Sequence, residues 1–136
     1  MSNPDNTVVP FRVADADRRI RHVFVRDLML DGHIGIHAHE QGVVQRLRIN
    51  LDLSVVDRHP LPADHIAHVV CYQEVVEATT AIVARGHVNL VETLAEEIAQ
   101  EILATPDVVT VRVRVEKLDA FANVASVGVE IERTSA

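Results

Sequence analysis

Four stretches of the chain have the residue pattern of β-strands. In residues 47–56, Leu, Ile and Val occupy every second position, and Arg, Asn, Asp and Ser occupy the positions between them. The same period of two runs through residues 108–117, where Val109 and every second residue up to Val115 are predicted on the apolar face, and through residues 126–133. Residues 22–30 are rich in β-branched and aliphatic side chains. The pattern predicts strands with one apolar and one polar face.

The middle of the chain changes to helical spacing. Apolar residues recur three and four positions apart in residues 71–86 and again in residues 89–106, which predicts two amphipathic helices. Gly86 is predicted as the C-terminal cap of the first helix. Asn89 and Glu92 are three residues apart and are predicted to form a capping box at the start of the second helix.

The order strand–strand–helix–helix–strand–strand predicts an α+β fold. A four-stranded antiparallel sheet would carry the two helices on its apolar face. Residues 1–20 are predicted to be a flexible N-terminal tail and residues 21–136 a single domain. The strands contain no proline that would block an outer edge, so the sheet is predicted to continue across subunits.

Composition narrows the functional classes. With 48% hydrophobic residues and no tryptophan, the core is predicted to be aliphatic. A net charge of −7 argues against nucleic acid or an anionic membrane as the main partner. The single cysteine, Cys71, excludes an internal disulfide and is predicted to be an inert core thiol. Because no apolar signal-peptide or membrane-spanning stretch is evident, a cytoplasmic protein is predicted.

Two residue types occur once each. Lys117 is the only lysine among 13 basic residues, and Tyr72 is the only tyrosine. A lysine can exchange a proton near neutral pH when its surroundings shift its pKa, whereas an arginine stays charged; codon bias is the alternative explanation. Tyr72 is either a core residue or a phenol that relays protons in a pocket.

Carboxylates and histidines give further candidates. Glu92 is either a cap or a carboxylate that grips a guanidine-like edge of a flat ligand. Glu40 follows the segment "HIGIHAH" and, taken alone, is predicted to be solvated near a turn. His37 and His39 would share one face of a strand, as zinc-binding pairs do, but no further ligand is apparent, and no metal is expected.

The chain resembles the dihydroneopterin aldolase family over roughly residues 22–133. The resemblance is carried by "VFVRDLMLDGHIGIHAHEQGVVQ", "VVCYQEVVEA", "NLVETLAEEIA" and "VRVRVEKLDAFANVASVGVEIER". It implies the tunnelling fold, in which subunits join their sheets into rings and stack as octamers, with active sites between subunits. It also implies retro-aldol cleavage of 7,8-dihydroneopterin in folate biosynthesis, without a cofactor, a metal or a Schiff base.

The resemblance also assigns site residues. Lys117 matches the family's proton-transferring lysine, and Tyr72 matches a pocket tyrosine that reaches the site from the neighbouring subunit. Val91 and Glu92 match the pair that holds the pterin, the first by its backbone and the second by its carboxylate. Glu40 matches a catalytic and substrate-binding glutamate.

Two alternatives remain open. The segment "EKLDAFANVASV" is similar to dihydroneopterin triphosphate epimerases, because leucine follows the lysine where many aldolases have proline. Such an enzyme would need cationic groups near the side-chain exit, for which Arg46 is a candidate. The other alternative is a non-catalytic, ring-forming pterin-binding protein.

Overall fold

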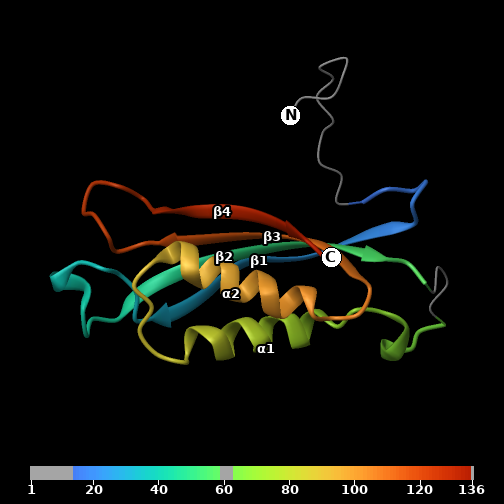
Figure 1. Cartoon of the computed structure of the whole chain (residues 1–136), viewed down its shortest axis with the longest axis horizontal. Helices are drawn as coiled ribbons and strands as arrows, with labels where there is room; N and C mark the ends of the chain where they lie inside the picture. The colour runs from blue at the N-terminus through green and yellow to red at the C-terminus, as the bar shows by residue number, and fades with distance from the viewer. Residues whose placement is uncertain (1–13, 59–62, 136) are drawn as a thin grey trace, which may run out of the picture.

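A computed structural model describes residues 14–58 and 63–135 of the chain (Figure 1). Most of the predicted N-terminal tail, residues 1–20, lies outside the described residues. The four strands form one antiparallel sheet in the order β1-β2-β3-β4, which confirms the predicted α+β fold. The elements are β1 (Ile20–Gly32), η1 (Ala38–Glu40), β2 (Gln45–Val56), η2 (Ile66–His68), α1 (Tyr72–Val83), α2 (Val91–Leu103), β3 (Val108–Lys117) and β4 (Val127–Thr134).

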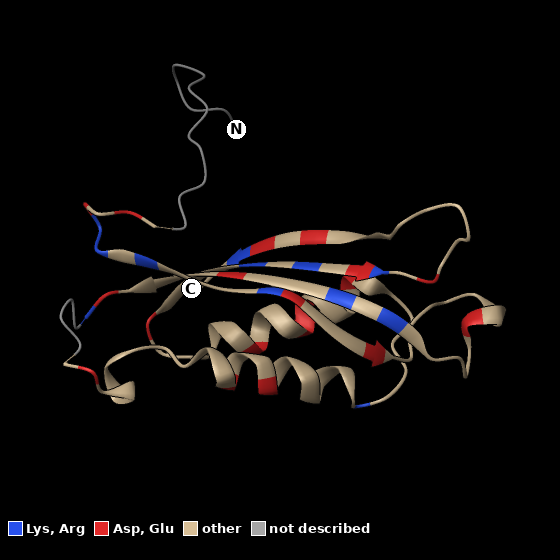
Figure 2. Cartoon of the chain, turned by 180° about the vertical axis from the view of Figure 1, so that it is seen from behind, with Lys and Arg blue, Asp and Glu red and all other residues tan. Residues whose placement is uncertain are grey.

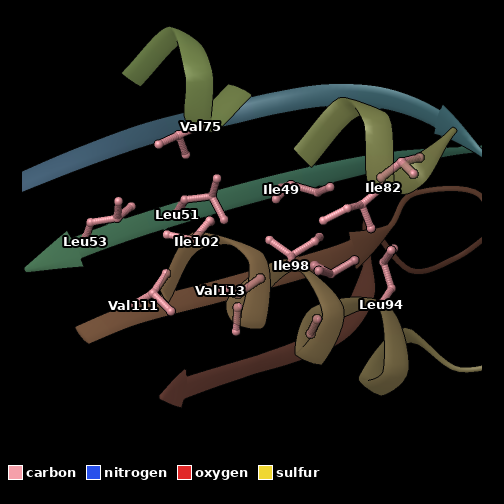
Figure 3. Packing of buried hydrophobic residues seen from close by; sticks show 14 of the residues in the cluster. Ile49, Leu51, Leu53, Val75, Ile82, Leu94, Ile98, Ile102, Val111 and Val113 are labelled. Carbon is pink, nitrogen blue, oxygen red and sulfur yellow. The ribbon is translucent and has the colours of Figure 1, made fainter. Parts of the chain in front are cut away.

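Helices α1 and α2 lie side by side on one face of the sheet (Figure 1). The core between the helices and the sheet is aliphatic in the described part of the chain, as predicted (Figure 3). The alternation of β2 is confirmed, since its apolar positions are at most 5% exposed: Leu47, Ile49, Leu51, Leu53 and Val55. No helix in the described ranges is long and apolar enough to cross a membrane.

All four strands lie within two residues of their predicted bounds. The period of two fails at one point, at the start of β3. Val108 pairs with Val55 and Thr110 pairs with Ser54, so Val109 is an extra residue in the ladder. This bulge shifts the alternation by one residue. Val108, at 4% exposed, therefore takes the core position predicted for Val109.

Neither predicted helix cap forms. Helix α1 ends with Ala84 as its C-cap, and Gly86 lies two residues farther on, with a φ of +136°. Helix α2 has Leu90 as its N-cap and no side-chain capping bond, so the capping box of Asn89 and Glu92 is wrong. For α2 the cause is tertiary: Val88 pairs with Ile34, Asn89 lies in a bend and Leu90 is extended, so the helix begins only at Val91.

The opposite face of the sheet is polar and carries charged side chains on all four strands (Figure 2). Ion pairs bridge directly opposed residues on neighbouring strands, including Arg48 with Glu116 and Arg114 with Glu130.

The outer strand β1 is interrupted by a bulge. Its pairing with β2 skips two residues between Val25 and Leu28, and Asp27 has a φ of +55°. The bulge is held by Asn50, whose side-chain oxygen accepts a hydrogen bond of 2.8 Å from the backbone N–H of Asp27.

Candidate active site

The ammonium of Lys117 and the carboxylate of Glu40 form a largely buried ion pair. Lys117 Nζ lies 2.8 Å from Glu40 Oε2, and the two side chains are 14% and 6% exposed. Lys117 is the last residue of β3, on the same face as Val113 and Val115, which are both fully buried. The strand that supplies the core therefore also brings the ammonium to the edge of the core.

The buried position of Glu40 corrects the prediction that it is solvated. It ends the short helix η1, within the connection between β1 and β2, and is only 5% exposed. Besides Lys117, its carboxylate accepts hydrogen bonds from Gln45 Nε2 at 2.9 Å and from the backbone N–H of His37 at 3.4 Å.

Glu40 is held in its ionised form. Burial acts to raise the pKa of this carboxyl, but the hydrogen bonds from Lys117 and Gln45, together with the Lys117 charge, outweigh that effect. The result is a pKa lowered from 4.5 to about 2. At neutral pH the site therefore contains a carboxylate whose negative charge is matched by one ammonium.

Gly35 makes room for the Glu40 carboxylate. Its φ is +131°, and a Cβ added there would overlap the carboxyl group of Glu40. Its carbonyl oxygen accepts hydrogen bonds from His87 Nε2 at 2.8 Å and from Gln41 Nε2 at 3.0 Å. Glycine alone adopts this backbone conformation at low cost and also leaves that space free for the Glu40 carboxylate.

Sequence reasoning did not identify Gln45, which completes the group around Glu40. Its Nε2 donates to Glu40 and also, at 2.6 Å, to the carbonyl oxygen of Ile34. Its Oε1 is buried and has no hydrogen-bond partner in the described part of the chain. A signal was available, because the period of two in β2 places Gln45 on the same face as Leu47 and Ile49. A polar residue at a core position needs partners.

The start of α2 lies at the same end of the sheet as the ion pair (Figure 1). The segment before it is tied to the Glu40 connection, since Gly35 N–H donates to the Val88 carbonyl at 3.0 Å. Val91 is 9% exposed, whereas the side chain of Glu92 is exposed and α2 begins without a side-chain cap. Because Leu90 makes no side-chain cap bond, the first N–H groups of the helix lack that partner, and Glu92 lies in the same first turn.

Tyr72 lies apart from these residues. It begins α1, at the end of that helix away from the ion pair (Figure 1), and it is 68% exposed. The interpretation of Tyr72 as a core residue is therefore wrong. Its neighbour Cys71 is only partly buried, so the prediction of a core thiol is also wrong.

His37 and His39 do not form the predicted strand pair. His37 precedes η1 and His39 lies within it, and their rings stack with centroids 5.7 Å apart. Among the described residues, no group of three or more His, Cys, Asp or Glu side chains is arranged to hold a metal ion.

The arrangement suits acid–base chemistry on a flat, polar ligand. Lys117 supplies a proton donor, Glu40 balances its charge, and the start of α2 supplies N–H donors beside the Glu92 carboxylate. Together, donors and a carboxylate on one helix end match a ligand edge that carries both acceptors and N–H groups.

The sequence matches the family model described as "FolB: Dihydroneopterin aldolase" over residues 23–132. The dihydroneopterin aldolase of Escherichia coli strain K12 is 32% identical over 111 residues, which cover 82% of this chain and 91% of that protein.

Solved structures give the same result. The Escherichia coli dihydroneopterin aldolase in complex with neopterin superposes with a TM-score of 0.78 at 32% identity, covering 83% of this chain and 98% of that one. The dihydroneopterin aldolase of Burkholderia thailendensis bound to guanine gives a TM-score of 0.76 at 35% identity, covering 87% and 93%.

Proposed function

The chain belongs to the dihydroneopterin aldolase family, which makes it a lyase, and from that premise we propose how its residues cleave 7,8-dihydroneopterin. The products are 6-hydroxymethyl-7,8-dihydropterin and glycolaldehyde. The observation that carries the proposal is the buried pair of Lys117 and Glu40, 2.8 Å apart, at the sheet end where α2 begins.

The substrate supplies its own electron sink. When the 2′-hydroxyl passes its proton to a relay through Tyr72, which later delivers a proton to C1′, the C1′–C2′ bond breaks, glycolaldehyde leaves, and the bonding pair moves into C1′=C6 while the C6=N5 imine takes a proton at N5. A proton added at C1′ and the return of the N5 proton then give the hydroxymethyl product. The chemistry therefore needs neither a metal nor a Schiff-base lysine.

Each site residue has a task in this scheme. The Lys117 ammonium gives the N5 proton and takes it back, and Glu40 keeps that ammonium in place. Glu92 accepts from the 2-amino and N3 edge of the pterin, while the Val91 backbone orients the ring. Tyr72, at the end of α1 that lies away from the ion pair, reaches the side chain of a substrate bound to a neighbouring subunit. The protein is proposed to be a ring-forming homo-oligomer for this reason.

The contacts of Arg46 argue against the triphosphate epimerase. Its guanidinium, the cation that would meet a phosphate, is bound by the Asp119 carboxylate at 2.8 Å. Epimerisation at C2′ as a side reaction stays compatible with the proposed site, because recapture of glycolaldehyde on its other face needs the same groups.

The first test is glycolaldehyde release from 7,8-dihydroneopterin, with the C2′ epimer measured in the same reaction. Cleavage should continue after exhaustive chelation. Borohydride added during turnover should leave Lys117 without a pterin adduct by mass spectrometry. Bound pterin without turnover would support the non-catalytic alternative, and a trapped Lys117 adduct that carries the pterin would contradict the scheme.

Lys117 variants separate proton transfer from charge. We expect Lys117→Ala to lower the single-turnover rate by about 10²–10⁴, the usual contribution of a positioned acid–base group. Lys117→Arg keeps the charge but cannot give up its proton, so it should also be slow. Pterin affinity should fall less in these variants than in Glu92→Ala. A wild-type rate in Lys117→Arg would show that proton exchange is not the task of this residue.

A further inference from the structure

Asp119, two residues after the end of β3, closes over the start of β2. The backbone N–H of Arg46 donates to Asp119 Oδ2 at 2.8 Å, and the Arg46 guanidinium donates to the same carboxylate through Nη2 at 2.8 Å and Nε at 3.2 Å. The backbone N–H of Leu118 donates to the Arg46 carbonyl oxygen at 3.0 Å. These bonds join both the backbone and the side chain of Arg46 to residues 118–119, and together we call them the Arg46–Asp119 clamp.

The clamp adjoins the two side chains that hold Glu40. Arg46 follows Gln45 in the chain, and Leu118 follows Lys117. Gln45 and Lys117 both donate to the same oxygen, Glu40 Oε2, at 2.9 and 2.8 Å. The last paired residues of the β2–β3 ladder are Leu47 and Lys117, so the clamp continues the connection beyond the point where the strands would otherwise separate.

Arg46 is further restrained from the other side. It is opposite Asp31 in the pairing of β1 with β2. The hydrogen bond to Asp119 and the charge of Asp119 raise the pKa of the guanidinium, and the charge of Asp31 adds a smaller effect in the same direction. Arg46 is thus flanked by carboxylates from β1 and from the segment after β3.

We propose that Asp119 is a positioning residue: through Arg46 and Leu118 it fixes the strand ends from which Lys117 and Gln45 reach Glu40. The inference rests on the proposed function, since it assumes that the place of the Lys117 ammonium matters for proton transfer. It adds to that function a residue that touches neither the ion pair nor the start of α2.

The exposure of the clamp indicates that it controls geometry more than stability. The side chains of Arg46 and Asp119 are 60% and 37% exposed, and exposed ion pairs contribute little to the free energy of folding. Proton transfer, in contrast, is sensitive to small displacements of the donor. Loss of the clamp should therefore slow the chemical step without unfolding the protein.

The first experiment compares single-turnover cleavage and pterin affinity in Asp119→Ala and Asp119→Asn. We expect Asp119→Ala to be slower by about tenfold or more, with an unchanged melting temperature and little change in pterin affinity. Asp119→Asn should recover part of the rate, because its amide oxygen still accepts the Arg46 N–H. Glu96→Ala, which removes the exposed ion pair of Glu96 with Arg133, is the matched control and should react at the wild-type rate.

The second experiment does not depend on turnover. Lys117 is the only lysine, so its acetylation by a small amount of acetic anhydride is measured by mass spectrometry of the peptide that contains it, apart from acetylation of the N-terminal amine. In Asp119→Ala the ammonium should be less well held by Glu40 and should be acetylated several-fold faster than in the wild type or Glu96→Ala.

The two readouts separate the two claims. If the wild type does not cleave dihydroneopterin but Asp119→Ala is acetylated faster, the proposed function fails and the positioning role stands. Acetylation of Lys117 at the wild-type rate in Asp119→Ala overturns the positioning role. So does a parallel fall of melting temperature, affinity and rate, which would show that Asp119 acts on folding.

Discussion

Outside the proposed site, Glu116 is a carboxylate that the fold both buries and keeps ionised. It is 5% exposed, on the polar face of the sheet. Arg48 donates two hydrogen bonds of 2.9 Å to its carboxylate, and Ser126 Oγ donates one of 2.7 Å. The bonds from Arg48, against the opposing effect of burial, lower the pKa of Glu116 from 4.5 to about 2.

This lowered pKa predicts a specific acid sensitivity. A carboxyl whose pKa is lower in the folded than in the unfolded state stabilises the fold fully above pH 4.5 and loses that effect as the pH falls towards 2. The difference between the two values corresponds to roughly 3 kcal/mol. Glu116→Gln should therefore lower the free energy of unfolding by about 2–3 kcal/mol at pH 7 and by much less near pH 2.5.

Urea unfolding of both proteins at the two pH values, at one fixed protein concentration, measures this difference. Glu130→Gln is the control, because Glu130 faces Arg114 on the same side of the sheet but is 44% exposed. A loss of stability in Glu116→Gln that is the same at both pH values would mean that packing, not ionisation, is the cause.

Single residues also show where sequence reasoning reaches its limit. The periods of β2 and β3 place Gln45 and Lys117 on the apolar face, so their unusual surroundings could be inferred from local pattern. Glu40 could not be placed in this way. Its burial depends on Lys117, 77 residues later in the chain, and on the absence of a side chain at Gly35. The partner Lys117 leaves no trace in the segment around Glu40, and Gly35, although visible there, does not by itself reveal which side chain it makes room for.

At the scale of an element, the connection between β1 and β2 depends on Gly35. We expect Gly35→Ala to displace the Glu40 carboxylate, because the new Cβ would occupy its place. The Lys117–Glu40 pair would then separate, and cleavage should fall by about 10²-fold or more, as it does when catalytic groups are displaced. Glycolaldehyde release, with a melting curve for each variant, measures the effect.

Gly86→Ala is a closely matched control. Gly86 has a φ of +136°, close to the +131° of Gly35, but a Cβ at Gly86 meets nothing within 4 Å. Because the two φ angles are similar, both substitutions carry a backbone strain on the order of 1–3 kcal/mol. The difference between them therefore isolates the contact with Glu40. Equal losses of activity in the two variants would refute the steric explanation.

Elements differ in how far sequence pattern determines their ends. Strand bounds followed from the period of two because burial of one face dominates a strand. The bulge at Val109 could not be predicted from this period, because Val108 and Val109 are adjacent valines and either one would suit the core. The caps of α1 and α2 could not be predicted from pattern for another reason. Pairing of Val88 with Ile34, far apart in sequence, decides where α2 begins.

At the scale of the whole molecule, the residues assigned to one reaction lie at two ends. Lys117 and Glu40 lie at the end of the sheet where β3 ends. Tyr72 begins α1 near the opposite end of the sheet (Figure 1). If a site is completed by the next subunit, two inactive variants should restore each other. We expect Lys117→Ala and Tyr72→Ala, unfolded and refolded together, to recover about a quarter of the wild-type sites by random mixing in a head-to-tail ring.

As a control, the two variants are refolded separately and then combined, which measures how far subunits exchange between assembled rings. Sedimentation of each sample should show a tetramer or an octamer. If the co-refolded mixture has no more activity than its separate components, Tyr72 does not act across a subunit boundary. A fully active monomer would contradict the shared site altogether.

The bulge in β1 bears on how the edge of the sheet can pair with other chains. Head-to-tail pairing of strand edges closes into a ring or runs on as an open filament, and a long, flat edge also invites amyloid-like stacking. β1 is 13 residues long, but its bulge divides it into Ile20–Val25 and Leu28–Gly32. A bent edge accepts a partner that follows the same bend and rejects an ordinary extended chain. We therefore expect the irregularity held by Asn50 to hinder unlimited strand addition at the β1 edge.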